Sequence, residues 1–160
     1  MASGVIGLGL PKVIDRFQGE YRWLSNFEPV DVVFEADLYP SVEHAYVAAK
    51  TTDRDLRKTI ARLATPGAAK RAGRALKVRA DWELVKLQIM EDLVRQKFMH
   101  VRLRRLLMST GDMEIIEGNT WGDQFWGMTW KDGAIPGWVG DNHLGKIIMK
   151  VRAEWMKENL

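Results

Sequence analysis

The sequence predicts an α+β fold: a single helix-dominated domain with a small N-terminal β-sheet. The chain has 160 residues, which is the length of one domain with its own core. Hydrophobic residues make up 46% and charged residues 28%, a composition that excludes disordered and low-complexity chains. Strand-like segments lie in the first forty residues, and helical periodicity begins near residue 41. There is no internal repeat and no linker, so we expect residues 1–160 to form one domain.

The predicted sheet comes from two short segments near the N-terminus. Val30–Phe34 is rich in β-branched residues, and Asp15–Phe17 resembles an edge strand. Gly19, Asn26 and Pro29 interrupt this region and are typical of turns.

Helices are predicted where a capping side chain precedes a periodic run or a glycine follows one. The expected helices are Val42–Lys50 after Ser41, a short helix from Asp53 to about Leu63, one from Thr65-Pro66 to Gly73, the longest from Trp82 to about Met99 after Asp81, Val101–Met108 before Thr110-Gly111, and a last helix capped by Asp141.

Between the last two helices the sequence predicts little regular structure. Met113–Glu117 is expected to form a short strand. Gly118–Gly140 contains six glycines and four of the seven tryptophans, so we expect an irregular loop. Glycines let the backbone approach a ligand, and tryptophans offer flat faces for stacking. The loop is therefore interpreted as functional, the alternative being an aromatic plug of the core.

Composition excludes several classes of site. The chain lacks cysteine, which excludes disulfides and thiolate zinc sites. His44, His100 and His143 lack the spacing of metal ligands, so no metal is predicted. The glycines within residues 1–11 do not form a dinucleotide fingerprint, and no cofactor is predicted.

The sequence also favours a cytosolic protein without a membrane partner. No run approaches the ~20 apolar residues that span a bilayer. The segment Met1–Pro11 is mildly apolar, but no basic residue precedes it, so we expect no signal peptide. The oligomeric state is not predicted.

Positive charge is concentrated between Leu56 and Ala80. The net charge is only +3, yet this block holds eight basic residues and no acidic one. Such a block is typical of a phosphate or nucleic-acid surface. The alternative is a solvated helical face balanced by acids elsewhere. The basic residues are Arg57, Lys58, Arg62, Lys70, Arg71, Arg74, Lys77 and Arg79.

Two predicted helices carry polar groups in unusual positions. Glu43, Tyr46 and Lys50 share one helical face, with the carboxylate and ammonium roughly 10 Å apart along the axis. They could line a cleft or form an ordinary surface face. Lys97 falls within the apolar stripe of the longest helix, where lysine needs a partner anion or a route to water.

A series of short motifs runs along the chain from about residue 15 to 155: Phe17-Gln-Gly19, Leu24-Ser-Asn-Phe27, Tyr39-Pro-Ser-Val-Glu-His-Ala-Tyr46 with Lys50, Asp81-Trp82, Met90, Lys97-Phe98, Leu107 with Thr110-Gly111, Phe125-Trp-Gly127, and Asn142-His-Leu-Gly145 with Met149 and Arg152. In these motifs and their order, the chain resembles the NADAR (YbiA-like) family. Residues between Gly127 and Asp141 depart from the family pattern, and we expect them to shape the substrate pocket.

The resemblance implies an N-glycosidase that acts at the anomeric carbon of a ribose phosphate. Some members of the family act on early riboflavin intermediates, and others remove ADP-ribose from guanine in nucleic acid. By motif, the resemblance transfers functional roles to Glu43, Trp82, Asp123 and Trp126.

Breaking a C1′–N bond requires stabilisation of positive charge at C1′, a proton for the leaving nitrogen, and a nucleophile. The hypothesis places Glu43 near C1′ as base or ion stabiliser and Asp123 on a ribose hydroxyl or a water. Trp82 and Trp126 would stack on the base. Candidates for the phosphate are Lys50, Lys97 and Arg74, and further expected substrate contacts are Asn26, Tyr46 and Asn142.

Several alternatives stay open. Lys50 or Lys97 could instead form a Schiff base with the ring-opened ribose aldehyde. The preferred substrate is a phosphorylated riboflavin precursor. The second candidate is ADP-ribosylated guanine in DNA or RNA, bound through residues 56–80. The third is a module that binds ADP-ribose or a nucleotide without cleaving it, which the presence of both Glu43 and Asp123 disfavours.

Overall fold

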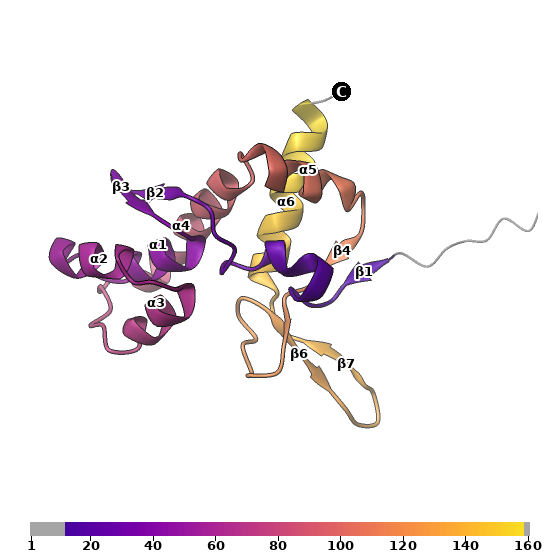
Figure 1. The fold of residues 1–160 in the computed structure, drawn as a ribbon. Coiled ribbons are helices and arrows are strands. Elements are labelled where there is room, and N and C mark those ends of the chain that lie inside the picture. Colours follow the sequence, from indigo (N-terminus) through magenta and orange to yellow (C-terminus); the bar gives the residue numbers. More distant parts are fainter. Residues whose placement is uncertain (1–11, 159–160) are drawn as a thin grey trace, which may run out of the picture.

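A computed structural model describes residues 12–158 of the chain (Figure 1). Helices dominate it and three small sheets complete it, which confirms the α+β prediction. Residues 1–11, where we expect no signal peptide, lie outside the described residues. Among residues 12–158, none of the helices is long and apolar enough to cross a membrane.

The predicted helices are all present. The α-helices are α1 (Val42–Ala49), α2 (Arg54–Ala61), α3 (Pro66–Gly73), α4 (Trp82–Lys97), α5 (Val101–Ser109) and α6 (His143–Glu158), and a 3-10 helix, η1 (Gly19–Leu24), was not predicted.

Three of the predicted caps are confirmed by hydrogen bonds, Asp81 has the N-cap position without a cap bond, and Asp141 is not the residue next to its helix. Ser41, Asp53 and Thr65 each accept hydrogen bonds from backbone N–H groups in the first turn of α1, α2 and α3. The Asp81 carboxylate instead pairs with Arg79 and makes no cap bond to α4. Asp141 lies two residues before α6, and Asn142 occupies the adjacent position.

The N-terminal strands differ in part from the prediction. A strand lies within Val30–Phe34, as expected: β2 (Val32–Phe34) pairs with β3 (Asp37–Tyr39) as an antiparallel hairpin. Asp15–Phe17, in contrast, is not a strand. The edge strand is β1 (Val13–Ile14), which pairs in parallel with β4 (Glu114–Ile115) inside the predicted segment 113–117. Ile14 and Ile115 are both buried, so core packing determines this register.

The turn between β2 and β3 uses residues that rarely form such turns. Glu35 and Ala36 both have positive φ, as a two-residue type I′ turn requires. Buried Arg57 of α2 supports the turn, because its guanidinium pairs with Glu35 and lies 4.9 Å from the centre of the Phe34 ring.

The irregular loop predicted for residues 118–140 contains a three-stranded sheet. Within it, β5 (Gly118–Asn119) pairs in parallel with β6 (Met128–Lys131), which pairs antiparallel with β7 (Gly137–Val139). Trp130 and Trp138 are cross-strand partners with ring centres 5.4 Å apart. Aromatic cross-strand pairs stabilise a hairpin, which explains regular structure in this glycine-rich segment.

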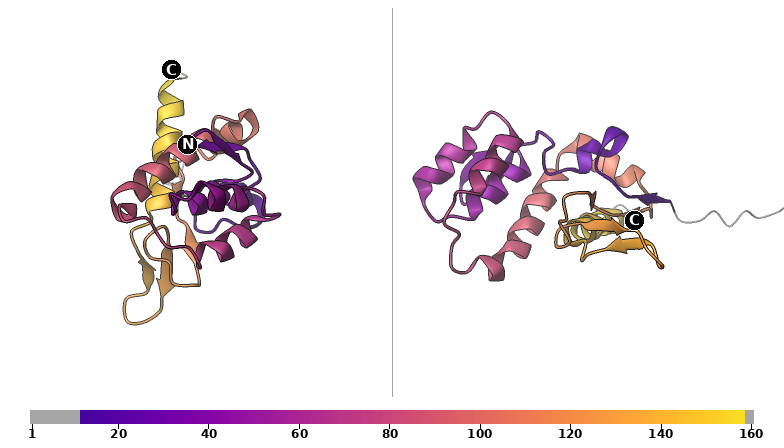
Figure 2. Two further views of the ribbon diagram at one scale, coloured as in Figure 1. Left: turned by 90° about the vertical axis from the view of Figure 1, so that its left-hand side faces the viewer. Right: turned by 90° about the horizontal axis from the view of Figure 1, so that it is seen from below.

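The helices gather around α1 and α4. Helix α1 packs against α2, α3 and α4, and α4 also packs against α6. Figure 2 shows α1–α3 on one side of α4, with α6 and the β6–β7 hairpin on the other. Buried residues from both sides, including Val42, Leu93 and Ile148, form one core.

Candidate active site

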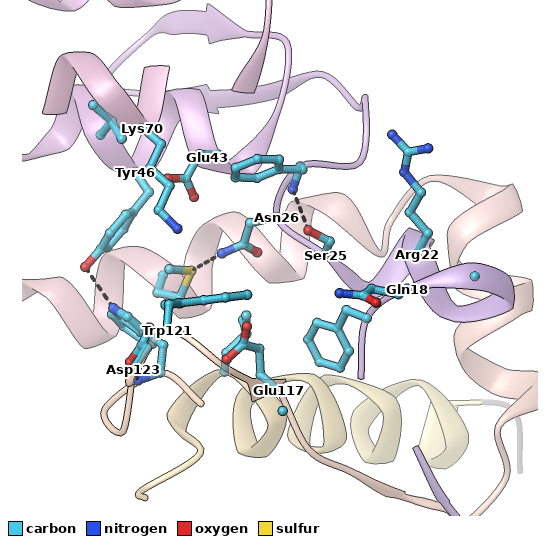
Figure 3. A pocket seen from close by; sticks show the side chains of 18 of the residues that line it. Gln18, Arg22, Ser25, Asn26, Glu43, Tyr46, Lys70, Glu117, Trp121 and Asp123 are labelled. Carbon is cyan, nitrogen blue, oxygen red and sulfur yellow. Dashed lines mark hydrogen bonds between the residues drawn. The ribbon is translucent and has the colours of Figure 1, made fainter. Parts of the chain in front are cut away.

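A cavity of about 510 Å³ lies where these two sides meet. Its walls come from the η1 region, from α1 and α3, and from the segment that follows β4 (Figure 3). The charged side chains in the walls are three acids and three bases: Glu43, Glu117 and Asp123, and Arg22, Lys50 and Lys70.

The predicted polar face of α1 forms one wall. Glu43, Tyr46 and Lys50 all line the cavity, while Ala45, Ala48 and Ala49 on the rest of the helix are completely buried. The first turn of α1 is held by the Glu43 N–H, which donates to the backbone oxygen of Asn26 at 3.1 Å. Small residues on the buried side let α1 pack closely and hold this face in place.

Burial shifts the pKa values of all three side chains. It raises the pKa of Glu43, an effect that Lys70 and Lys50 partly offset. It lowers the pKa of Lys50, although the nearby Glu43 carboxylate opposes the change. Burial also raises the pKa of Tyr46, so its hydroxyl stays protonated. Low-dielectric surroundings disfavour the charged form of each group.

Aromatic rings form the next part of the wall. The Trp126 indole lines the cavity, and its Nε1 donates to the Tyr46 hydroxyl at 3.2 Å. Trp82 contacts the Tyr46 ring at 5.1 Å between centres but does not line the cavity. Its indole supports Tyr46 within the core, so stacking of Trp82 on a base does not fit this structure.

Hydrogen bonds fix the segment that carries Asp123. The Asn119 amide accepts from the backbone N–H groups of Gly122 and Asp123 and donates to the Asp123 carbonyl. Asp123 Oδ1 in turn accepts from the N–H groups of Phe125 and Trp126. Asp123 and Trp126 are thus placed by the same short turn.

Asn26 lines the cavity and has one buried polar atom without a partner within the described residues. Its Nδ2 contacts the sulfur of Met90 at 3.5 Å, while its buried Oδ1 has no hydrogen-bond partner within the described residues. Buried polar atoms are nearly always paired, so this acceptor would gain a partner if the Asn26 side chain turned it toward a ligand that donates.

Three predicted substrate contacts besides Trp82 lie outside the cavity. Lys97 is 1% exposed, and its ammonium donates to the carbonyls of Leu24 and Ser25. Burial lowers the pKa of Lys97 to about 7. The Asn142 amide accepts from the Glu117 N–H and donates to the Ile115 carbonyl. Arg74 is exposed at the end of α3. The Lys97 and Asn142 side chains are already hydrogen-bonded to backbone groups of distant segments, so they are not available to a substrate.

Sequence reasoning missed three charged residues of the cavity. Glu117 follows β4, Arg22 lies on η1, and the Lys70 ammonium lies 5.3 Å from the centre of the Trp121 ring. Lys70 was visible only as one of eight residues in the basic block. Glu117 ended a predicted strand and gave no signal of its own. No group of three or more His, Asp or Glu residues within residues 12–158 is arranged to hold a metal ion.

The eight residues of the basic block lie in different surroundings and do not form one surface. Arg57 is buried and donates to the Thr51 carbonyl besides pairing with Glu35. Arg79 pairs with Asp81, and Lys70 faces the cavity. The remaining basic residues of the block are exposed: Lys58, Arg62, Arg71, Arg74 and Lys77.

The segment that departs from the family pattern shapes a neighbouring hollow. None of residues 128–140 lines the main cavity, contrary to expectation. Thr129, Trp130, Lys131 and Trp138 instead line a second hollow of about 450 Å³, which shares Gln18, Gly118 and Trp121 with the main cavity.

Comparison with known proteins identifies relatives along most of the chain. The NADAR domain model matches residues 15–156. An N-glycosidase from Nostoc punctiforme is 39% identical over 84% of this chain and 85% of its own length. A riboflavin biosynthesis protein from Vibrio vulnificus is 35% identical over 84% of this chain but only 35% of its own length. The solved structure of Escherichia coli YbiA superposes with a TM-score of 0.76, at 32% identity, covering 93% of this chain and 88% of YbiA.

Proposed function

This chain belongs to the NADAR family, and from that premise we propose that it is an N-glycosidase that hydrolyses the bond between a ribose phosphate C1′ and a nitrogen base. The preferred substrates are phosphorylated early intermediates of riboflavin synthesis. Relatives from Vibrio vulnificus and maize are named riboflavin biosynthesis proteins, which supports this class.

The observation that carries the proposal is the position of Glu43. Its carboxylate lines a cavity that also holds Lys50 and the Tyr46–Trp126 aromatic wall. A carboxylate beside C1′ stabilises the positive charge that develops there and accepts a proton from an attacking water. Burial strengthens both effects, because a carboxylate out of bulk water interacts more strongly with nearby charge.

The other cavity groups supply binding. The Trp126 indole offers a face for the base, and the Asn26 amide suits a ribose hydroxyl once its side chain turns the unpaired Oδ1 toward the cavity. Asp123 binds a second hydroxyl or the water. Lys50, Lys70 and Arg22 are the cations available to the phosphate, in place of Lys97 and Arg74.

Lys50 has two possible roles, and one experiment separates them. As an ammonium it holds the phosphate. Its lowered pKa also increases the fraction of neutral amine, the form that attacks an aldehyde to give a Schiff base. Borohydride added during turnover traps a covalent adduct on Lys50 only if the Schiff base forms.

The test of the proposed function is a product assay with Glu43→Gln. Wild-type protein incubated with a phosphorylated riboflavin precursor should release free base, detected by mass spectrometry. The substitution keeps the shape of the side chain and removes its charge, so we expect kcat to fall by about 10²-fold or more. Glu114→Gln is the matched control, because Glu114 is an exposed carboxylate on β4 outside the cavity. Near-wild-type turnover in Glu43→Gln would remove Glu43 from the mechanism.

A further inference from the structure

Glu117 is a cavity carboxyl group that the proposed mechanism does not yet use. It lies between β4 and β5, in the wall that faces α1 across the cavity. Figure 3 shows Glu43 entering the space from α1 and Glu117 from the opposite segment. A substrate bound between them has one carboxyl group on each side.

The backbone of Glu117 is held from two directions. Its N–H donates to the Asn142 amide oxygen at 3.0 Å, and its carbonyl accepts from the Met128 N–H at 2.9 Å. Asn142, at the start of α6, also donates to the Ile115 carbonyl at 2.9 Å. Helix α6 and strand β6 therefore both fix this residue, which is the rigidity that a reacting group requires.

The carboxyl group itself is oriented and given space. Asn119 Nδ2 donates to Glu117 Oε2 at 3.1 Å, leaving the other carboxyl oxygen for a ligand. A Cβ built on Gly127 would overlap both Oε2 and the backbone oxygen of Glu117. The glycine of the Phe125-Trp-Gly127 motif thus makes room for this carboxyl group.

The surroundings keep the carboxyl group partly protonated at neutral pH. Burial raises the pKa of Glu117 to about 7, and the nearby Asp123 adds to this effect. The Asn119 hydrogen bond and the Lys70 ammonium oppose it. The cavity also holds Glu43, Lys50 and Arg22. A carboxylic acid that titrates near the working pH is suited to proton transfer.

We propose that Glu117 is the catalytic acid that protonates the leaving nitrogen when the C1′–N bond breaks. The bonding electron pair goes to the nitrogen, which takes the proton from the free carboxyl oxygen of Glu117. Water adds to C1′ and gives a proton to Glu43. Solvent then returns a proton to Glu117 and removes one from Glu43, so the net reaction consumes one water. This assignment rests on the proposed N-glycosidase function.

Asp123 is less suited to this step. Its Oδ1 already accepts two backbone N–H groups, which use the carboxylate as an acceptor. Glu117 accepts one amide hydrogen bond and lies in a setting that favours its neutral form. Asp123 therefore binds a substrate hydroxyl or the water, and Glu117 donates the proton to the leaving nitrogen.

The first experiment compares Glu117→Gln with the neighbouring control Glu114→Gln. We expect kcat of Glu117→Gln to fall by about 10²–10⁴-fold, the scale of a lost general acid, with KM changed much less. The loss should shrink with a substrate whose leaving group needs no proton, such as a nitrophenyl riboside phosphate. Glu114→Gln should remain near wild type.

If Glu117→Gln retains wild-type kcat while the wild type is active, the assignment is wrong and the proposed function stands. If the wild type releases no base from any N-glycosyl substrate, the proposed function itself fails.

The titration of Glu117 gives a second test, and its NMR part does not depend on turnover. Carbon-detected NMR of the wild-type protein should show one glutamate carboxyl, absent in Glu117→Gln, that titrates near pH 7. The wild-type rate should fall as pH rises through this value, because the acid loses its proton, and the Gln variant should lack that limb. A Glu117 carboxyl that titrates near pH 4 would overturn the assignment.

Discussion

Two tryptophans contact the Tyr46 ring, and the structure gives them different roles. Ring centres lie 5.5 Å from Tyr46 for Trp126 and 5.1 Å for Trp82, but only Trp126 lines the cavity. The family resemblance implies a functional role for both. At the scale of single residues, exposure to the cavity therefore separates a binding ring from a supporting one.

Trp126→Ala and Trp82→Ala should consequently affect different measurements. We expect Trp126→Ala to weaken substrate binding by about 1–3 kcal/mol through loss of stacking. Trp82→Ala removes a buried side chain and should reduce the free energy of unfolding by about 3–5 kcal/mol. Calorimetric binding of a substrate analogue and thermal melting, measured on both variants, test this. Equal binding losses in the two variants would place Trp82 in contact with substrate.

At the scale of elements, one short helix and one turn position the chemistry. Helix α1 holds Glu43, Tyr46 and Lys50 on one face. The turn before β6 holds Asp123 and Trp126, and it is anchored to the start of α6, because backbone N–H groups of residues 141–144 donate to the carbonyls of residues 124–127. The start of α6 thus anchors the Trp126 segment as well as Glu117.

The Ser41 cap is expected to be a strong determinant of α1. Its buried hydroxyl accepts from the His44 N–H at 3.1 Å and pairs with His44 Nδ1 at 2.7 Å. Ser41→Ala should destabilise the protein by about 1–2 kcal/mol. For a chain of this length that lowers Tm by roughly 2–8 °C. Below the transition, kcat should remain close to wild type.

Thr65→Ala at the exposed start of α3 is the matched control, since the Thr65 hydroxyl caps through a single bond to the Ala68 N–H. Its Tm should fall less than that of Ser41→Ala. A larger fall for Thr65→Ala would contradict the role assigned to the buried Ser41–His44 pair.

At the scale of the whole molecule, charge is distributed between a cavity and an exposed face. Within the basic block, the Lys70 side chain lines the cavity and the Arg57 side chain is buried in the core. Other cations of the block are exposed, among them Lys58 on α2, Arg62 at the end of α2 and Lys77 after α3. These cations are the ones available to a nucleic-acid backbone.

Reversing these three charges tests the substrate class. A small ribose phosphate uses cavity cations, so we expect Lys58→Glu, Arg62→Glu and Lys77→Glu combined to leave its kcat/KM nearly unchanged. Cleavage of ADP-ribosylated DNA, if this is the substrate, should fall at least about tenfold at low salt and lose salt dependence. Arg105, Lys146 and Lys157 are exposed cations outside the block, and their reversal is the charge-matched control. A loss confined to modified DNA in the first variant would favour the nucleic-acid substrate.

The sequence by itself determined the helices and the α1 face. Ser41, Asp53 and Thr65 cap their helices through bonds to residues two or three positions away. The alignment of Glu43, Tyr46 and Lys50 follows from helical geometry alone. Such local interactions leave a pattern within a few residues, which is why they could be predicted.

Only the tertiary structure decided the β2–β3 turn, the place of Lys97 and the presence of Glu117 in the cavity. Glu35 and Ala36 adopt positive φ without the usual Asn-Gly signal, and Arg57 supports their turn from α2. Lys97 meets carbonyls more than seventy positions away, and Glu117 is clamped by Asn142. These contacts join segments that are distant in sequence, so no local pattern contains them, and packing of the core brings them together.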